Sequence, residues 1–417
     1  MGSVANNFAY HYVNASHFLG HDVEIPFVPD IVSVIPALDE PLIFDTLESI
    51  LEAETEQKVL IIVVVNYSIK ATEYTKLFNR HVYELLVAYA RQLQSDYFAV
   101  LPIFYPDMPR KHAGAGLARK VGMDTAIGIF AQVNNQNGII TSLDADCRIE
   151  PNYFQSIAAH FTQHSRSQVA TIHFMHRRDH LAPLHKHAID QYELYLRYFV
   201  LACRWAGFPY AFQTIGSCFA VRALGYVKNG GMSKKHAGED FYFLQKMFPD
   251  GENQALYNTR VYPSSRLSRR VPFGTGPALC DIVERQTPYH VYAFEAFDQL
   301  RKFYMQLAVL YEHTSIENVF PEALRHYFIE AGLVDKLEEA RRNSTNVSLF
   351  TKRLLTHFNA FQLVKYLNYT HDNCIYSKGL VTSETLRLFD AFQISIPDDN
   401  RIENLLQIAE NLELGSY

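Results

Sequence analysis

Cysteine and tryptophan are scarce in this sequence, which has five cysteines and one tryptophan among its 417 residues. The cysteines form no CxxC pair and no spacing typical of a zinc site; they are Cys147, Cys203, Cys218, Cys280 and Cys374. A zinc module needs closely spaced pairs of ligands, and a disulfide framework needs an even, patterned set. The scattered cysteines therefore argue against both classes and indicate a reducing compartment.

Long apolar runs and an excess of basic residues are also missing. The most apolar stretch, Val59 to Val65, is far too short to cross a bilayer. Residues 1–20 lack the basic and apolar regions of a signal peptide. The formal net charge of -6 argues against a dedicated nucleic-acid binder. We therefore expect a cytoplasmic protein without a transmembrane segment; peripheral attachment at the inner membrane stays open as an alternative.

Strands and helices alternate along the first two thirds of the chain. Residues 31–36 form a β-branched run that predicts a strand ending at Pro36, because proline cannot continue a central strand. Residues 59–65 are apolar on both faces, as expected of a strand in a parallel sheet covered by helices on both sides. A helix over 72–94 and a strand near 98–104 continue the pattern. This alternation predicts an α/β fold with a mostly parallel sheet.

The character of the sequence changes from about Asp281 onward. The remainder shows helical periodicity, for example at Phe294 and Phe297, and no convincing series of strands. We therefore predict two domains, an α/β domain over residues 1–280 and an α-helical domain over residues 281–417. The second region contains no motif that indicates its function.

The motif with the clearest chemical meaning is Asp144-Ala145-Asp146, which follows the apolar run Ile139 to Leu143. On a continuing strand, side chains two positions apart point to the same face, so the two carboxylates could converge on one cation. Hard divalent ions such as Mg²⁺ prefer oxygen ligands and commonly combine one or two carboxylates with substrate phosphates. A strand followed by an Asp-rich turn explains the same residues without a ligand. The choice between a cation site and a turn therefore depends on the surrounding motifs.

Three further segments join polar or basic side chains to predicted elements. A Gly/Ala-rich helix start over residues 111–124 allows close approach to a neighbouring helix or to a ligand. Glu239 and Asp240 open a helix, where acids act as caps or as reactive groups. The loop over 262–276 combines glycines with arginines, which suit oxyanions, although a solvated basic loop is the alternative reading.

Asp39, Asn66 and Asp144 come after the first, second and fourth predicted strands, respectively. Ligands of open parallel sheets bind outside the carboxyl ends of the strands. The sequence therefore places a candidate ligand site at that edge.

These segments, in this order, resemble the GT-A nucleotide-sugar glycosyltransferases of family 2. Members of that family typically have a V-S-V-I-I-P strand followed by Tyr-Asn-Glu, an Ala-Arg-Asn-x-Gly helix, a Leu-Asp-x-Asp strand end, and Gly-Gly followed by Glu-Asp. The corresponding segments here are Val32 to Pro36 with Asp39 and Glu40, Ala118 to Gly122, Leu143 to Asp146, and Gly230-Gly231 with Glu239-Asp240. The resemblance covers roughly residues 31–276.

The resemblance implies a metal-dependent, inverting and non-processive glycosyltransferase, of the hexosyltransferase type, in polysaccharide biosynthesis. The donor would be a UDP- or GDP-sugar, and the acceptor a glycan or another hydroxyl compound. Mn²⁺ or Mg²⁺ would bind Asp144 and Asp146, and Asp240 would be the general base, with Glu239 in reserve. The residues implied in donor binding are Pro36, Asp39, Glu40, Asn66, Lys111, Arg119, Asp144, Arg266, Ser268 and Arg270.

Two departures from the family pattern bear on these expectations. The second strand has Asn66 where the family often has an Asp that contacts the nucleotide base. An Asn carbonyl can still accept a hydrogen bond from a base, although without charge. The Gln-x-x-Arg-Trp motif of processive synthases is missing after Asp240, which favours a non-processive enzyme.

Two other readings remain open from the sequence. A non-catalytic GT-A-like module would use the helical region to dock onto a partner, and Asn66 is the best support for it. A sugar-phosphate nucleotidyltransferase would also use an α/β sheet and a divalent ion. It would normally have a glycine-rich basic loop after the first strand, where this sequence has the acidic stretch Ala37 to Glu40.

Overall fold

The computed structural model describes residues 8–9, 12–13, 25–234, 238–271, 274–312, 316, 319–396 and 400–415. The chain divides into two compact units. The sheet unit comprises Met1–Asp179 and Thr214–Gly274, and the helical unit comprises His180–Gln213 and Thr275–Tyr417. This division differs from a single boundary at residue 280, because a segment from the middle of the sequence groups with the C-terminal helices.

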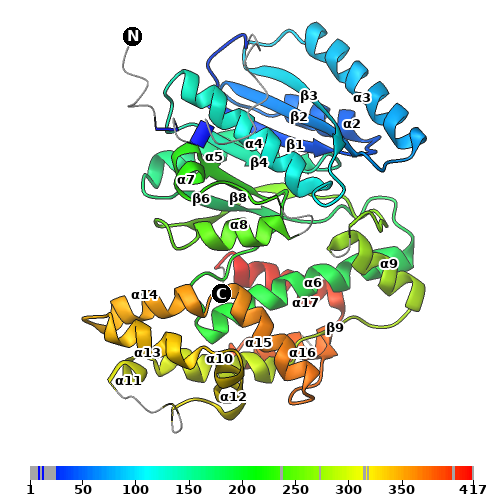
Figure 1. The fold of residues 1–417 in the computed structure, drawn as a ribbon. Helices are drawn as coiled ribbons and strands as arrows, with labels where there is room; N and C mark the ends of the chain where they lie inside the picture. The colour runs from blue at the N-terminus through cyan, green and yellow to red at the C-terminus, as the bar shows by residue number, and fades with distance from the viewer. Residues whose placement is uncertain are drawn as a thin grey trace. The chain divides into compact units, whose positions relative to one another are not determined.

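Eight strands of the sheet unit form one sheet, in the order β3-β2-β1-β4-β7-β6-β8-β5 (Figure 1). They are β1 (Ile31–Ala37), β2 (Val59–Ser68), β3 (Phe98–Met108), β4 (Ile139–Ser142), β5 (Arg148–Ile149), β6 (Val169–Phe174), β7 (Phe219–Arg222) and β8 (Gln254–Tyr262). Strands β3, β2, β1 and β4 pair in parallel, as do β6 and β8. Strand β7 is antiparallel to both of its neighbours, and β5 is antiparallel to β8. The predicted α/β fold with a mostly parallel sheet is confirmed.

The prediction that the first strand ends at Pro36 is wrong, because β1 continues to Ala37 and Pro36 pairs with Val64 of β2. The pairing of β1 with the shorter β4 reaches only Val34. Pro36 therefore lies where the strand has a partner on one side, which is the edge-like position that tolerates proline.

The helices of the sheet unit connect and cover these strands. They are α2 (Ile43–Leu51), α3 (Glu73–Gln92), α4 (Ala115–Gln132), α5 (Tyr153–Gln163), α7 (Ala223–Lys228) and α8 (Glu239–Met247). Helix α4 is buried from Gly116 to Phe130 and packs on β1 and β2 (Figure 1). A Cβ on its Gly122 would overlap Val34 Cγ1 and lie 3.1 Å from Val64 Cγ2. At this position, the small residue of the Gly/Ala-rich segment serves helix–sheet packing.

A Gly122→Ala variant should be destabilised by roughly 1–3 kcal/mol, because the added methyl group overpacks the contact of α4 with the sheet. The free energy of unfolding in urea measures this loss. The double variant Gly122→Ala/Val34→Ala provides the control, since removing the Val34 methyl groups opens the space that the alanine needs. It should lose less than the sum of the two single losses. An unfolding midpoint of Gly122→Ala equal to that of the wild type would contradict the packing role.

The described part of the helical unit consists of helices and one small strand pair. Its elements are α6 (Pro183–Ala206), α9 (Thr275–Arg285), β9 (His290–Val291), α10 (Phe294–Met305), α11 (Leu307–Glu312), α12 (Glu322–Glu330), α13 (Val334–Arg342), α14 (Val347–His357), α15 (Ala360–Asp372), β10 (Gly379–Leu380), α16 (Val381–Ala391) and α17 (Ile402–Glu413). The predicted helical character of the C-terminal region is confirmed. None of the described helices is both long and apolar enough to cross a membrane.

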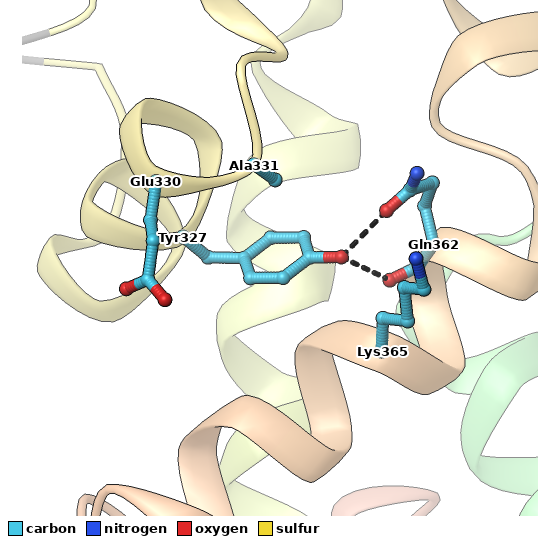
Figure 2. A pocket seen from close by; sticks show the side chains of 5 residues that line it. All are labelled: Tyr327, Glu330, Ala331, Gln362 and Lys365. Atoms are coloured by element: carbon cyan, nitrogen blue, oxygen red, sulfur yellow. Dashed lines mark hydrogen bonds between the residues drawn. The ribbon is translucent and has the colours of Figure 1, made fainter.

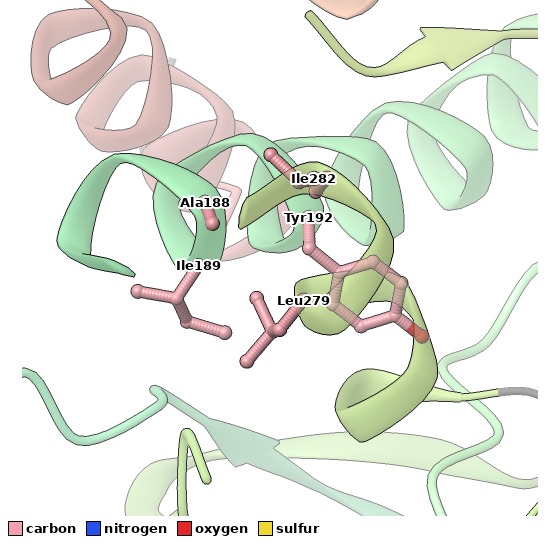
Figure 3. Close-up of a cluster of buried hydrophobic side chains, with 5 residues drawn as sticks. All are labelled: Ala188, Ile189, Tyr192, Leu279 and Ile282. Atoms are coloured by element: carbon pink, nitrogen blue, oxygen red, sulfur yellow. The ribbon is translucent and has the colours of Figure 1, made fainter. Parts of the chain in front are cut away.

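Helix α6 joins this unit through apolar and ionic contacts. Its Ile189 and Tyr192 pack in a buried cluster with Leu279 of α9 (Figure 3). Farther along α6, the buried guanidinium of Arg197 forms an ion pair with Glu413 at the end of α17. Because each contact joins residues far apart in the sequence, the linear sequence does not reveal that α6 belongs with the C-terminal helices.

Candidate functional site

The candidate site lies at the carboxyl ends of β1 and β4, which are parallel neighbours in the sheet. Four other segments reach the same place: helix α4, the start of α8 and the basic loop after β8 with side chains, and the loop before β7 with the Gly216 carbonyl. All of them belong to the sheet unit. This is the edge at which ligands of open α/β sheets bind.

The two aspartates of the Asp144-Ala145-Asp146 motif lie in a turn. Strand β4 ends at Ser142, and the Cys147 N–H donates to the Asp144 carbonyl over 3.2 Å. Of the two alternatives that the sequence leaves open, a continuing strand and an Asp-rich turn, the structure shows the turn. The side chains of Asp144 and Asp146 are 43% and 19% exposed, and they pair with different arginines.

Arg119 lies on α4 and is 3% exposed. Its Nη2 donates to Asp144 Oδ1 over 2.7 Å, and its Nη1 donates to Glu239 Oε1. Its Nε donates to Ser142 Oγ over 2.9 Å. Burial lowers the pKa of Arg119, but the neighbouring carboxylates of Asp144, Glu239 and Asp240 outweigh it and hold the pKa above its usual value. The guanidinium is therefore charged and links the two acidic motifs.

Glu239 and Asp240, the first two residues of α8, have different environments. Glu239 is 4% exposed and is bound to Arg119. Asp240 is half-buried, and its Oδ1 accepts the Phe241 N–H over 2.7 Å. Burial and the nearby Glu239 raise the pKa of Asp240 to about 6, against the opposing charge of Arg119. Asp240 is thus the carboxylate of the pair that is more open to solvent and titrates close to neutral pH.

The basic loop after β8 closes onto the acidic residues through Arg266 and Arg270. Arg266 forms a two-pronged contact with Glu40, with Nη1–Oε1 and Nη2–Oε2 distances of 3.0 and 2.6 Å, and its Nη2 lies 3.1 Å from Asp146 Oδ2. Arg270 Nη2 lies 3.2 Å from Glu40 Oε2, and its Nη1 donates to the Leu38 carbonyl. Burial, Asp144 and Glu40 raise the pKa of Asp146 to about 6, although the two arginines oppose this.

The structure brings together most of the residues predicted for the site, but the side chains of three point elsewhere. Asp39 Oδ1 accepts a hydrogen bond from Asn79 Nδ2 of α3 over 2.6 Å, so this carboxylate links the end of β1 to α3, whereas the Asp39 carbonyl accepts from Arg270 Nη1 over 3.3 Å. Asn66 is 2% exposed, and its amide contacts Met108 Sδ at 3.5 Å. Lys111 is exposed, and no hydrogen bond or ion pair joins it to the acidic residues among the described parts of the chain.

Two more predicted donor-binding residues, Pro36 and Ser268, lie in segments that contribute to the site. Pro36 lies in β1, one residue before the strand's end. Ser268 lies in the basic loop, where its Oγ is 3.4 Å from both the backbone N and the Nε of Arg270. Ser268 therefore contacts an arginine of the site without touching a carboxylate.

Sequence reasoning missed Ser142 and Gly216. The Ser142 hydroxyl donates to the Gly216 carbonyl over 2.7 Å while it accepts from Arg119. A Cβ on Gly216 would lie 2.9 Å from Arg119 Nη2 and 3.0 Å from Asp240 Oδ2. Ser142 lies two residues before Asp144 in the sequence, so its place near the acidic motif could have been predicted. No local pattern marks Gly216, because its importance comes from side chains that approach it from elsewhere in the sequence.

The residues present fit a divalent cation that also binds phosphate. Asp144 and Asp146 each use one carboxylate oxygen in their contact with arginine. Carboxylate oxygens suit Mg²⁺ and Mn²⁺, and such ions often take the rest of their ligands from substrate phosphates. No cluster of three or more His, Cys, Asp or Glu side chains forms a complete metal site within the described parts of the chain.

The helical unit has a pocket between α12 and α15 (Figure 2). It encloses about 170 Å³ and is lined by Tyr327, Glu330, Ala331, Gln362 and Lys365. The Tyr327 hydroxyl points across it and donates to Gln362 Oε1 over 2.6 Å. With a single carboxylate and no arginine, this lining lacks the groups that a metal–diphosphate site needs.

Comparison with known proteins connects this geometry to a family. The sequence model of glycosyl transferase family group 2 matches residues 139–368, which is more than half of the chain. The matched segment contains the acidic motif, Glu239, Asp240 and the basic loop. A search of curated proteins finds no match.

Two solved structures with a similar chain course are complexes with UDP-GlcNAc and with GDP-Man, respectively. The chain is similar to S. aureus TarS 1-349 in complex with UDP-GlcNAc, with 14% identity, 93% of each chain covered and a TM-score of 0.39. It is also similar to the mannosyltransferase PcManGT from Pyrobaculum calidifontis in complex with GDP-Man and Mn²⁺, with 12% identity, 99% of this chain and 95% of that chain covered, and a TM-score of 0.36. The assignment to a family rests on the family model.

Proposed function

This chain belongs to glycosyl transferase family group 2, and we propose that it transfers a sugar from a nucleotide-diphosphate donor to an acceptor hydroxyl, with inversion and one sugar at a time. In that reaction the acceptor oxygen bonds to the anomeric carbon and its proton passes to a base. The bond from that carbon to the diphosphate breaks, and its electron pair leaves with the diphosphate. A single displacement of this kind inverts the anomeric centre.

The observation that carries this proposal is the meeting of two acidic motifs and three arginines at one edge of the sheet. Asp240 supplies a half-buried carboxylate whose raised pKa suits proton transfer near neutral pH. Arg266 and Arg270 supply forked donors for diphosphate oxygens. The arginines now contact Glu40 and Asp146, so a donor would exchange these carboxylates for its phosphates.

We propose that Asp146, together with Asp144, holds Mn²⁺ or Mg²⁺ next to the diphosphate. Such an ion would stabilise the negative charge that develops on the leaving group. Asp146 is the nearer of the two to the basic loop, since it already contacts Arg266. Asp144 is held by Arg119 and keeps 43% of its side chain exposed.

A binding screen tests the function. The full chain is heated with a panel of UDP- and GDP-sugars, each with and without Mn²⁺, and the melting temperature is recorded. Because a ligand that binds only the folded state stabilises it by mass action, we expect at least one donor to raise the melting temperature, and only with Mn²⁺ present. Transfer is then measured with that donor. No shift across the panel would contradict the proposal and favour a non-catalytic module.

The value of kcat/KM should rise with pH through about 6, because Asp240 accepts the acceptor's proton only when ionised. Burial and Glu239 raise the pKa of Asp240 to about 6, so protonation removes the base below that pH. The loss should approach about tenfold per pH unit on the acid side. Measurements at saturating Mn²⁺ separate this effect from Asp146, whose proton the cation displaces. A flat profile between pH 5 and 7 would contradict the role of Asp240.

A further inference from the structure

The side chain of Arg119 contacts both acidic motifs. Through its two terminal nitrogens it binds Asp144, in the turn after β4, and Glu239, at the start of α8. These two residues lie 95 positions apart in the sequence. A single guanidinium therefore connects the turn after β4 to the start of α8.

The third contact of Arg119 fixes the guanidinium itself. Its Nε donates to Ser142 Oγ over 2.9 Å, and the Ser142 hydroxyl in turn donates a hydrogen bond to the Gly216 carbonyl over 2.7 Å. Side chain and guanidinium are buried, with 3% of Arg119 exposed. A donor sugar could reach the guanidinium only by displacing Asp144 or Glu239.

Gly216 lies next to both Arg119 and Asp240. The position that a Cβ would take lies 2.9 Å from Arg119 Nη2 and 3.0 Å from Asp240 Oδ2. Distances this short leave no room for a side chain between the guanidinium and the carboxylate. The absence of a side chain at residue 216 therefore lets Arg119 and Asp240 approach each other across the backbone.

We infer that Arg119 is a positioning residue, which sets the separation between the leaving-group end of the site and the base. It holds Asp144 directly, and it holds Asp240 through the neighbouring Glu239 at the start of α8. Its charge also keeps the pKa of Asp240 from rising further. This inference rests on the proposed function. It assigns Arg119 the role of fixing the distance between Asp144 and Asp240, in place of the direct donor contact that the sequence predicted.

The main test compares Arg119→Lys with Gly216→Ala. A lysine keeps the charge, but one ammonium group cannot reproduce the planar fork that meets three separate acceptors. The added methyl of Gly216→Ala removes no possible donor contact, yet it pushes on Arg119 and Asp240. Both variants should lower kcat by about 100-fold, the cost of a misplacement of roughly 1 Å, while the donor dissociation constant changes by less than about threefold.

Two further readouts separate positioning from general destabilisation. In both variants the acid limb of the kcat/KM profile should move up by at least about half a pH unit, because the guanidinium no longer lies as close to Asp240. The double variant should be no slower than the slower single variant, because both substitutions break one arrangement. Ser142→Ala removes the Nε contact and the hydrogen bond to the Gly216 carbonyl but leaves both carboxylate contacts of Arg119, so it should show a smaller loss of kcat. It replaces Arg119→Lys in the comparison if that variant fails to fold.

Arg222→Lys is the matched control. Arg222 lies in the same unit and donates from Nε to the Ser167 carbonyl over 2.8 Å and from Nη2 to the Phe161 carbonyl. In the part of the chain that the structure describes, no hydrogen bond or ion pair joins it to the acidic motifs. It should lower the melting temperature and leave kcat and the pH profile unchanged.

The outcomes separate this inference from the proposed function. A wild-type chain that neither binds nor transfers from any donor overturns the proposed function. An active wild type whose Arg119→Lys variant loses donor affinity at unchanged kcat, or whose two losses multiply in the double variant, overturns the positioning role. The same holds if Arg222→Lys reproduces the effects of Arg119→Lys.

Discussion

An Asp240→Asn variant should bind the nucleotide-sugar donor as well as the wild type and transfer the sugar about 10²–10⁴-fold more slowly, the usual contribution of a positioned general base. Asparagine keeps the shape of the side chain, and its carbonyl oxygen can still accept the Phe241 N–H that Asp240 Oδ1 accepts over 2.7 Å. Its amide cannot take the proton of the acceptor hydroxyl. Donor affinity by calorimetry and single-turnover transfer rates measure the two effects separately.

The structure distinguishes Asp240 from Glu239 as the candidate base. Glu239 is 4% exposed and committed to the buried Arg119. An acceptor hydroxyl could reach it only by breaking that ion pair. Asp240 is half-buried, and burial next to Glu239 raises its pKa to about 6, a value that leaves it ionised and basic at pH 7.

The pH profile and two companion variants complete this experiment. In Asp240→Asn, the residual activity should lose the acid limb near pH 6. Glu239→Gln should instead weaken the hold on Arg119 and affect stability as well as rate. Glu252→Gln is the control, because it neutralises an exposed carboxylate that pairs with Arg166, away from the site, and it should behave as wild type. Transfer by Asp240→Asn at the wild-type rate would remove Asp240 from the mechanism.

The architecture of the sheet unit could be predicted because its signals are local. The apolar run of β2 and the amphipathic α3 show their periodicity within a single window of sequence. The short strand β5, which pairs only with β8, has two residues and offers no such window. The extent of β1 was misjudged at Pro36 because whether proline is tolerated depends on the length of the neighbouring strand, and that length is not a local property.

The candidate site was predictable as a set of residue types and less so as a set of contacts. The acidic motif, Arg119 and the Glu239-Asp240 pair were all named from motif order, and the structure places Asp144 and Glu239 within hydrogen-bonding reach of Arg119. Their partners were not predictable, because ion pairs such as Arg266 with Glu40 join residues 226 positions apart. Asn66 shows the converse, since a polar residue at a strand end turned inward to Met108.

The Asp146→Ala variant should lose the part of donor affinity that depends on Mn²⁺. Removing this carboxylate takes away one of the two proposed cation ligands, and the other, Asp144, is already engaged by Arg119. Loss of a ligand from so small a set should weaken Mn²⁺ binding by at least about 10–100-fold, the range seen even for changes in residues that only support metal ligands. Calorimetric titration of Mn²⁺ into the chain, first alone and then with donor present, measures the effect.

The fold should survive this substitution because the basic loop keeps its main anchor. Arg266 remains bound to Glu40 through both terminal nitrogens, and Arg270 remains bound to the same carboxylate. Removing Asp146 also frees Arg266 from a competing carboxylate, so donor affinity without Mn²⁺ should stay equal or rise slightly. Asp45→Ala, an exposed acid in the first turn of α2, is the control for loss of a carboxylate in the same unit.

The comparison with and without metal decides what Asp146 does. If it holds the cation, the two donor affinities of Asp146→Ala become equal, whereas those of the wild type and of Asp45→Ala differ. If Asp146 served only to retain Arg266, the variant would keep the wild-type response to Mn²⁺. Unchanged donor affinity in the presence of Mn²⁺ would therefore exclude Asp146 as a metal ligand. The negative charge of the diphosphate would then be stabilised by Arg266 and Arg270, whose guanidinium groups can bind it without a cation.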